Sequence, residues 1–105
     1  MKRIRNGVIF DTDKAEEICT WVNGFNCGDF EWIMETLYRS ENKKMFFIVG
    51  EGGAKTEYSR PLGNNSVSGG SRLWEVSEKE ALVWMEEKDC EMTDEVTSFF
   101  ESLIK

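Results

Sequence analysis

Apolar and polar side chains alternate regularly in the middle of the chain, between residues 30 and 39. One parity carries Phe30, Trp32, Met34, Thr36 and Tyr38, and the other carries Glu31, Glu35 and Arg39. A period of two residues is typical of a strand with one buried face. Residues 45–49 are apolar on both parities, which is typical of a central strand covered on two sides. Because the polar segment 40–43 between them suits a hairpin loop, we predict a hairpin at the centre of a sheet.

The N-terminal part predicts a hairpin and then a helix. Asn6-Gly7 is a strong two-residue turn signal, so residues 2–10 are expected to form a small hairpin. The next apolar residues follow the i, i+3, i+4, i+7 spacing of one helix face: Ala15, Ile18, Cys19 and Val22. Residues 11–13 offer a helix cap and Asn23-Gly24 a helix stop. We therefore predict a helix over residues 13–22.

The C-terminal half predicts a long irregular segment followed by a strand and two helices. Residues 50–71 are rich in glycine, with room for one short strand at 56–60, and residues 72–76 show a strand pattern. Ser77 and Glu80 form a capping box for a helix that ends near Lys88. Thr93 is expected to cap a last helix, whose apolar stripe is Val96, Phe99, Phe100, Leu103 and Ile104.

These patterns predict an α+β fold in a single domain over residues 1–105. The expected sheet is mainly antiparallel with four to five strands, with one helix after the first hairpin and two C-terminal helices. The apolar stripe of the final helix is expected to enter the core, although a homodimer would use it equally well.

Residue types in the chain restrict its chemistry. The sequence has no histidine, which removes histidine-based acid–base and nucleophilic catalysis and the commonest transition-metal ligand. Its three cysteines, Cys19, Cys27 and Cys90, are odd in number and widely spaced, so they do not outline a disulfide framework. Cys19 is expected to pack as a small hydrophobe. The N-terminus lacks the apolar core of a signal peptide, and we expect a cytoplasmic protein with no cofactor and no metal.

The glycine-rich segment 50–56 follows a predicted strand and invites comparison with a phosphate-binding loop. That loop needs glycine immediately before the lysine and again five residues earlier, but these positions are Ala54 and Val49. Glycines at the end of a central strand also allow a sharp turn or a close backbone approach. Glu51 is the candidate carboxylate if there is catalysis, but a chain of 105 residues rarely supplies a deep cleft, so we expect no enzyme.

Negative charge is concentrated in the C-terminal third. Residues 1–71 hold 10 acidic and 9 basic residues, whereas residues 72–105 hold 10 and 4. This distribution disfavours direct binding to a phosphate backbone and favours a basic partner surface. A solvated acidic helix face that keeps the protein soluble explains the same distribution.

Several motifs taken together resemble a family of small, largely uncharacterised proteins carried by phages and other mobile elements of bacteria. They are Asn6-Gly7, Phe10-Asp-Thr12, Glu35-Thr-Leu-Tyr-Arg39, Gly50-Glu-Gly-Gly-Ala54, Tyr58, Gly63-Asn-Asn-Ser66, Gly69-Gly70 and the helix start Ser77-Glu-x-Glu-Ala81. The resemblance runs from residue 4 to residue 87. Residues 41–44 replace the family's small-residue turn, and residues 90–105 have no clear counterpart.

The resemblance implies anti-CRISPR-type relatives, and therefore a small inhibitor that binds a host protein such as a CRISPR effector nuclease and blocks its engagement of nucleic acid. No membrane or direct nucleic-acid partner is expected. An acidic surface suits a groove built for polyanions, and the residues expected to form it are Glu86, Glu87, Asp89, Glu91, Asp94 and Glu95. If the shared motifs carry the function, the site is Tyr38, Arg39, Glu51, Gly52, Gly53 and Tyr58. The alternative is a module that sequesters a small molecule or nucleotide with the 50–71 loop.

Overall fold

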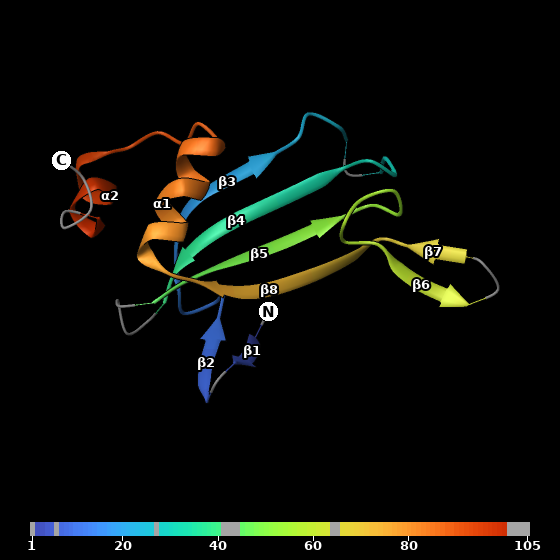
Figure 1. The fold of residues 1–105 in the computed structure, drawn as a ribbon, viewed down its shortest axis with the longest axis horizontal. Helices are drawn as coiled ribbons and strands as arrows, with labels where there is room; N and C mark the ends of the chain where they lie inside the picture. The colour runs from blue at the N-terminus through green and yellow to red at the C-terminus, as the bar shows by residue number, and fades with distance from the viewer. Residues whose placement is uncertain (1, 6, 27, 41–44, 64–65, 101–105) are drawn as a thin grey trace.

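A four-stranded antiparallel sheet forms the centre of the computed structural model, which describes residues 2–5, 7–26, 28–40, 45–63 and 66–100 (Figure 1). The strand order is β3-β4-β5-β8. Their bounds are β3 (Glu16–Val22), β4 (Ile33–Arg39), β5 (Phe46–Gly52) and β8 (Gly70–Val76). The predicted hairpin at the centre of the sheet is confirmed, since β4 and β5 are the two inner strands. Its turn residues 41–43 lie outside the described residues.

Two short hairpins and two helices complete the fold. The hairpins are β1 (Lys2–Arg5) with β2 (Val8–Asp11), as predicted, and β6 (Arg60–Gly63) with β7 (Ser66–Ser68). The helices are α1 (Glu78–Glu87) and α2 (Asp94–Phe99). Figure 1 shows the β6–β7 hairpin extending from the end of the sheet opposite the helices. None of the helices in the described ranges is long and apolar enough to cross a membrane.

The prediction of a helix over residues 13–22 is wrong, because this segment forms the edge strand β3. The apolar spacing fits a helix, but Ile18 to Val22 is an unbroken run of residue types that favour strands. Pairing with β4 also satisfies backbone groups that β4 would otherwise leave open. A bulge between Glu17 and Cys19 shifts the register, and beyond it Trp21 lies opposite Glu35.

The prediction that residues 30–39 bury one face is also wrong, because β4 is covered on both faces. Thr36 and Leu37 belong to opposite parities, yet both are buried. The parity that carries the charged residues faces the helices, so Glu35 is only 6% exposed. An inner strand of a sheet covered on two sides has no solvated face, whatever its pattern.

Residues 50–71 are more regular than expected, because they contain the β6–β7 hairpin. The short strand expected at 56–60 is not formed; residues 54–58 turn, and the strand begins at Arg60. The hairpin stands apart from the main sheet, which leaves Leu62 65% exposed.

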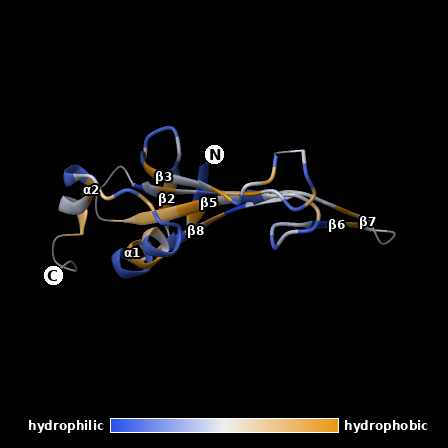
Figure 2. Ribbon diagram, turned by 90° about the horizontal axis from the view of Figure 1, so that it is seen from above, coloured by the Kyte–Doolittle hydropathy of each residue, from blue (hydrophilic) through white to orange (hydrophobic). Residues whose placement is uncertain are grey.

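Two apolar clusters cover the two faces of the sheet. On the helix side, Leu37, Phe46, Ile48 and Val76 pack against Ala81, Trp84, Met85 and Phe100. On the other side, Phe10 of β2 packs on Phe47 and Leu73. Seen edge-on, α1 lies along one side of the sheet (Figure 2).

Both C-terminal helices begin at the predicted caps. The Ser77 hydroxyl accepts a hydrogen bond from the Glu80 amide at 3.1 Å, and the Glu80 carboxylate accepts one from the Ser77 amide at 3.0 Å. The Thr93 hydroxyl accepts one from the Val96 amide at 3.2 Å. Phe100, next to the end of α2, is fully buried and stacks on Phe46, which confirms the core role of this part of the stripe. Leu103 and Ile104 lie outside the described residues.

A disulfide bond joins Cys19 of β3 to Cys90, which follows α1. Cys19 packs against the helix-side core, as predicted, but the expectation that the cysteines do not outline a disulfide is wrong. An odd number of cysteines is compatible with one pair, and two cysteines 71 residues apart carry no spacing signal. The bond links the edge of the sheet to the segment between the two helices.

We expect replacement of Leu37 by alanine to lower the free energy of unfolding by about 2–5 kcal/mol, because it leaves a cavity beneath α1. Urea denaturation measures the change. Leu62→Ala is the matched control, and it should change stability by less than about 0.5 kcal/mol because Leu62 is exposed. Similar losses in the two variants would contradict this assignment of the core.

Candidate functional site

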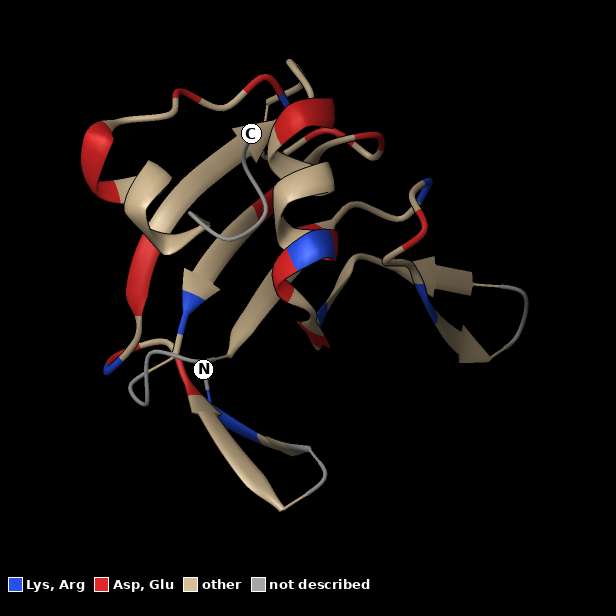
Figure 3. Cartoon of the chain, turned by 60° about the vertical axis from the view of Figure 1, so that its left-hand side comes forward, with Lys and Arg blue, Asp and Glu red and all other residues tan. Residues whose placement is uncertain are grey.

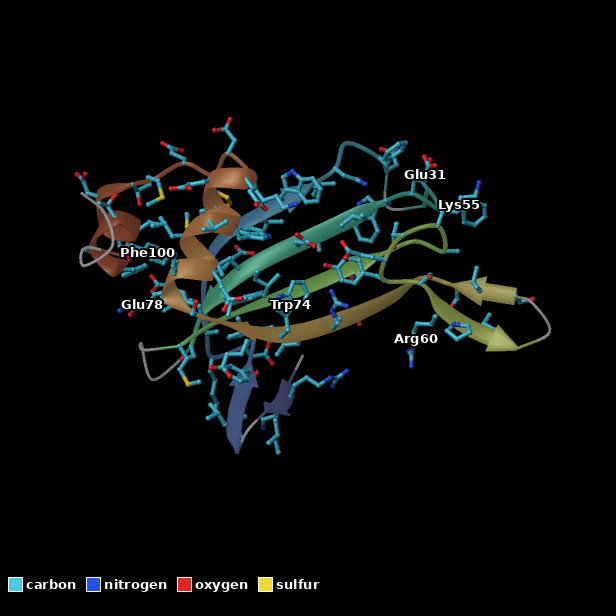
Figure 4. The ribbon with its side chains drawn as sticks, viewed as in Figure 1. Glu31, Lys55, Arg60, Trp74, Glu78 and Phe100 are labelled. Carbon is cyan, nitrogen blue, oxygen red and sulfur yellow. A yellow bond between two sulfur atoms is a disulfide. The ribbon has the colours of Figure 1, made fainter. Side chains whose placement is uncertain are left out.

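Glu35 lies at the centre of a row of residues that runs across the helix side of the sheet. In this row Trp21, Glu35, Gly50 and Arg72 lie directly opposite one another on β3, β4, β5 and β8. Gly50 leaves room for the ring of Tyr58, since a Cβ atom at this position would overlap that ring. The Arg72 guanidinium lies over the Trp74 ring, 4.6 Å from its centroid, at the exposed end of the row. Figure 4 shows Trp74 on β8, beside this row.

The Glu35 carboxylate receives three donors. The Trp84 indole nitrogen donates to Oε1 at 3.0 Å, and the Tyr58 hydroxyl donates to Oε2. The Lys88 ammonium lies 3.6 Å from Oε1. A buried carboxylate needs such partners, because desolvation without them is costly. This arrangement holds α1 and the 54–58 turn against the sheet.

The environment of Tyr58 changes its acidity. Burial, together with its hydrogen bond to Glu35, raises the pKa of Tyr58. The neutral phenol is therefore the stable form in the folded protein, and it acts as a hydrogen-bond donor to the carboxylate.

Lys88 is turned towards the interior. Its ammonium lies 3.8 Å from the centroid of the Trp21 ring as well as beside Glu35, and its side chain is 22% exposed. Between Glu86 and Phe99 it is the only basic residue in the sequence. Its position leaves the acidic side chains around it without a neutralising neighbour from their own segment.

The six acidic residues predicted as a surface are all exposed and lie around the C-terminal end of α1 and the start of α2 (Figure 3). The structure adds two more from β3, Glu16 and Glu17, which line one hollow with Glu91 and Glu95. We call the eight residues the acidic surface: Glu16, Glu17, Glu86, Glu87, Asp89, Glu91, Asp94 and Glu95.

The hollow between β3 and α2 has a volume of about 320 Å³ and an apolar floor. The floor is formed by Ile18, Cys19, Val96 and Phe99. Arg39 lies at its margin, 3.9 Å from the Glu16 carboxylate and stacked on the Phe99 ring. Glu86 and Asp89 line a second hollow with Met85 and Met92, and Glu87 lines a third with Trp74.

Sequence reasoning missed Glu16 and Glu17 because it assigned them to a helix. The signal that would have placed them on a strand is the run of strand-forming residues immediately after them, from Ile18 to Val22. As members of an edge strand beside α2, they extend the acidic surface onto the sheet.

The alternative motif residues come together only in part, because Gly52 lies against the Tyr58 ring while Tyr38 and Arg39 lie at the other end of β4. Tyr38 stacks on Phe47, on the side of the sheet opposite the helices, whereas Arg39 packs on Phe99 on the helix side. Tyr58 binds Glu35, and Glu51 lies in register with Met34 and Ser71. These residues therefore occupy different faces rather than one site.

The glycine-rich turn uses its backbone amides within the protein. The Gly53 amide donates to the Trp32 carbonyl at 2.9 Å, and the Lys55 amide donates to the Phe30 carbonyl at 2.8 Å. A Cβ atom at Gly53 would collide with the carbonyl oxygens of Asp29 and Phe30, and one at Gly52 with the Thr56 hydroxyl. The prediction that these glycines serve close backbone approach is confirmed.

Among the residues that the structure describes, no three histidine, cysteine, aspartate or glutamate side chains are placed to hold a metal ion. Comparison with known proteins finds no matching family, no matching curated protein and no matching solved structure.

We expect Glu35→Ala to lower the free energy of unfolding by about 3 kcal/mol, because it leaves the donors of Tyr58, Trp84 and Lys88 without their acceptor. Thermal or urea denaturation measures the loss. Glu31→Ala, at an exposed position of the same parity, should change stability by less than about 0.5 kcal/mol. Equal effects would show that the buried network contributes little.

The raised pKa of Tyr58 predicts a loss of stability in alkali. Above pH 10, the ordinary tyrosine value, the unfolded chain releases this proton while the folded protein retains it. Stability should therefore fall as pH rises, by up to about 1.4 kcal/mol per pH unit from this group. Urea titrations at pH values from about 8 to about 11 measure the slope of the unfolding free energy against pH, and Tyr58→Phe should remove the contribution of Tyr58 to it. Burial also raises the pKa of Tyr38, so Tyr38→Phe should remove only the contribution of Tyr38 and leave that of Tyr58 in place. Identical slopes in wild type and Tyr58→Phe would contradict the assignment.

Proposed function

We propose that this chain is a non-enzymatic inhibitor from a phage or mobile element that uses its acidic surface to bind a basic groove on a host defence protein. The observation that carries the proposal is the acidic surface itself, with eight exposed carboxylates at one end of the molecule and Lys88 turned inward beneath them. The family resemblance makes a CRISPR effector nuclease the first partner to test. The proposed place of action is the host cytoplasm.

Electrostatics support this mode of binding. A groove that holds nucleic acid is lined with lysine and arginine, and its field attracts a concentrated patch of carboxylates. An effector of the CRISPR type holds its guide and target in such a channel, so an acidic protein seated there blocks nucleic acid by occupancy. Inhibition of this kind requires no chemical step, and it agrees with the use of Glu35 and Tyr58 as hydrogen-bonding groups of the interior.

The two other functions considered from the sequence receive less support. A small-molecule or phosphate site in the glycine-rich segment needs free backbone amides, but those of Gly53 and Lys55 are already bonded. A homodimer through the final helix needs a free apolar stripe, but within the described part of that stripe Phe100 is fully buried against Phe46 of the same chain.

The test is affinity capture with the tagged chain from cells that carry CRISPR effectors, together with two charge-reversal variants. We expect Glu86→Lys/Glu91→Lys/Glu95→Lys to lower retention of the effector at least about tenfold, which corresponds to about 1.4 kcal/mol. The matched control Glu31→Lys/Glu57→Lys/Glu75→Lys carries the same change of charge on exposed residues outside the acidic surface, and it should retain most binding.

Retention of the wild type should also fall between about 0.05 M and about 0.5 M salt, since exposed charges are screened. Circular dichroism confirms that both variants are folded. Equal retention of the two variants, or no enriched protein with the wild type, would reject the proposal.

A further inference from the structure

The segment that carries three of the eight residues of the acidic surface, Glu91, Asp94 and Glu95, is held to the sheet by few contacts. Residues 91–100 contain α2, which has no fully buried residue. Among the described residues, the hydrogen bonds of this segment stay within it, such as those from the Thr97 amide to Thr93 and from the Phe100 amide to Thr97. Its attachment therefore depends on the side chains of Val96, Phe99 and Phe100 and on the disulfide at Cys90.

The same disulfide holds like charges together. Glu16 and Glu17 on β3 share a hollow of about 320 Å³ with Glu91 and Glu95, and Cys19 forms part of its floor. Four carboxylates around one hollow repel one another, and within this set Arg39 pairs with Glu16 alone, at 3.9 Å. The covalent bond at the edge of this hollow opposes the repulsion, because it ties Cys19 of β3 to the residue that precedes Glu91.

We propose that the Cys19–Cys90 disulfide is a redox lock on the acidic surface. In the oxidised protein the bond keeps residues 91–100 against β3 and concentrates the eight carboxylates. After reduction, repulsion between Glu16 and Glu17 on one side and Glu91 and Glu95 on the other displaces the segment, and the surface loses its charge density. This inference rests on the proposed function for its effect on binding, but not for the structural change.

The proposed place of action, the cytoplasm, supports a regulatory role for this bond, and this part of the argument rests on the proposed function. Thiols are kept reduced in the cytoplasm, where disulfides in most organisms are transient and serve catalysis or redox sensing. Both cysteines are only partly buried, so the pair lies near the protein surface rather than deep in the core. In the proposed cytoplasmic setting, the pair that the structure joins would therefore have an oxidised and a reduced state.

The chemical step is a thiol–disulfide exchange with a dithiol reductant. A thiolate of the reductant attacks one sulfur of the pair, which breaks the Cys19–Cys90 bond and forms a mixed disulfide. The second thiol of the reductant then attacks the mixed disulfide. The two cysteines end as thiols with two added electrons and two protons, and the dithiol ends as a disulfide.

Amide hydrogen exchange of the intact protein tests the structural change. A Cys27→Ser background leaves the pair as the only cysteines, and thiol alkylation with mass spectrometry verifies that the oxidised form has no free thiol and the dithiothreitol-treated form has two. We expect reduction to speed exchange in residues 91–100 at least about tenfold, with residues 46–52 of β5 unchanged. An unchanged exchange rate in residues 91–100 would overturn the lock. Equal acceleration in residues 91–100 and 46–52 would also overturn it, because the bond would then stabilise the whole fold rather than this segment.

Charge neutralisation tests the cause of the displacement. Glu17→Gln/Glu91→Gln/Glu95→Gln should keep residues 91–100 protected even after reduction, whereas Glu31→Gln/Glu57→Gln/Glu75→Gln should not. Persistent opening of the first variant would overturn the role of repulsion. In Cys19→Ser/Cys90→Ser, residues 91–100 should exchange as fast as in the reduced protein, with or without dithiothreitol. If this variant does not fold, the comparison of the oxidised and reduced Cys27→Ser protein still tests the lock.

A decalysine peptide serves as the basic probe for binding. The oxidised protein should bind it several-fold more tightly than the reduced protein at low salt. Equal binding in the two states would overturn control of the surface by the bond. No binding in either state would count against the proposed function, while the exchange measurement would still decide the redox lock.

Discussion

The buried carboxylate of Glu35 is the constraint on which the arrangement of this protein depends. It lies on an inner strand, yet its three donors come from other elements: Trp84 and Lys88 from α1 and its C-terminal end, and Tyr58 from the turn before β6. An unpaired carboxylate at this depth would oppose folding, so these segments are ordered together. Lys88 points inward because its ammonium pairs with the buried Glu35 carboxylate. It therefore does not neutralise the exposed acidic residues around it.

The pattern of the sequence predicted the central hairpin, the last strand and both C-terminal helices because these elements carry strong local signals. The capping box at Ser77 and the cap at Thr93 are specific to helix starts. A short apolar run such as residues 46–49 is typical of a buried strand. Residues 13–22 were assigned wrongly because their apolar spacing suits a helix while their residue types suit a strand. The choice was made by pairing with β4, which is a long-range contact.

Only part of the candidate site could be predicted from the sequence, again because long-range contacts complete it. Acidic residues close together in sequence, from Glu86 to Glu95, were recognised directly, but Glu16 and Glu17 join them through the fold. The role of Glu35 was equally hidden, since the alternation of β4 places a glutamate where a solvated side chain is expected. The link between Cys19 and Cys90 requires knowledge of which strand lies beside the end of α1, and spacing along the chain does not contain it.

The bulge in β3 bears on how copies of this protein behave at high concentration. An edge strand exposes unpaired backbone groups and can template a ladder with another chain. Here the extra residue between Glu17 and Cys19 interrupts the regular spacing of those groups, and Glu16 and Glu17 add charge at the same end of the strand. The β3 edge of the sheet is therefore a poor template for strand-to-strand pairing with another copy of the chain.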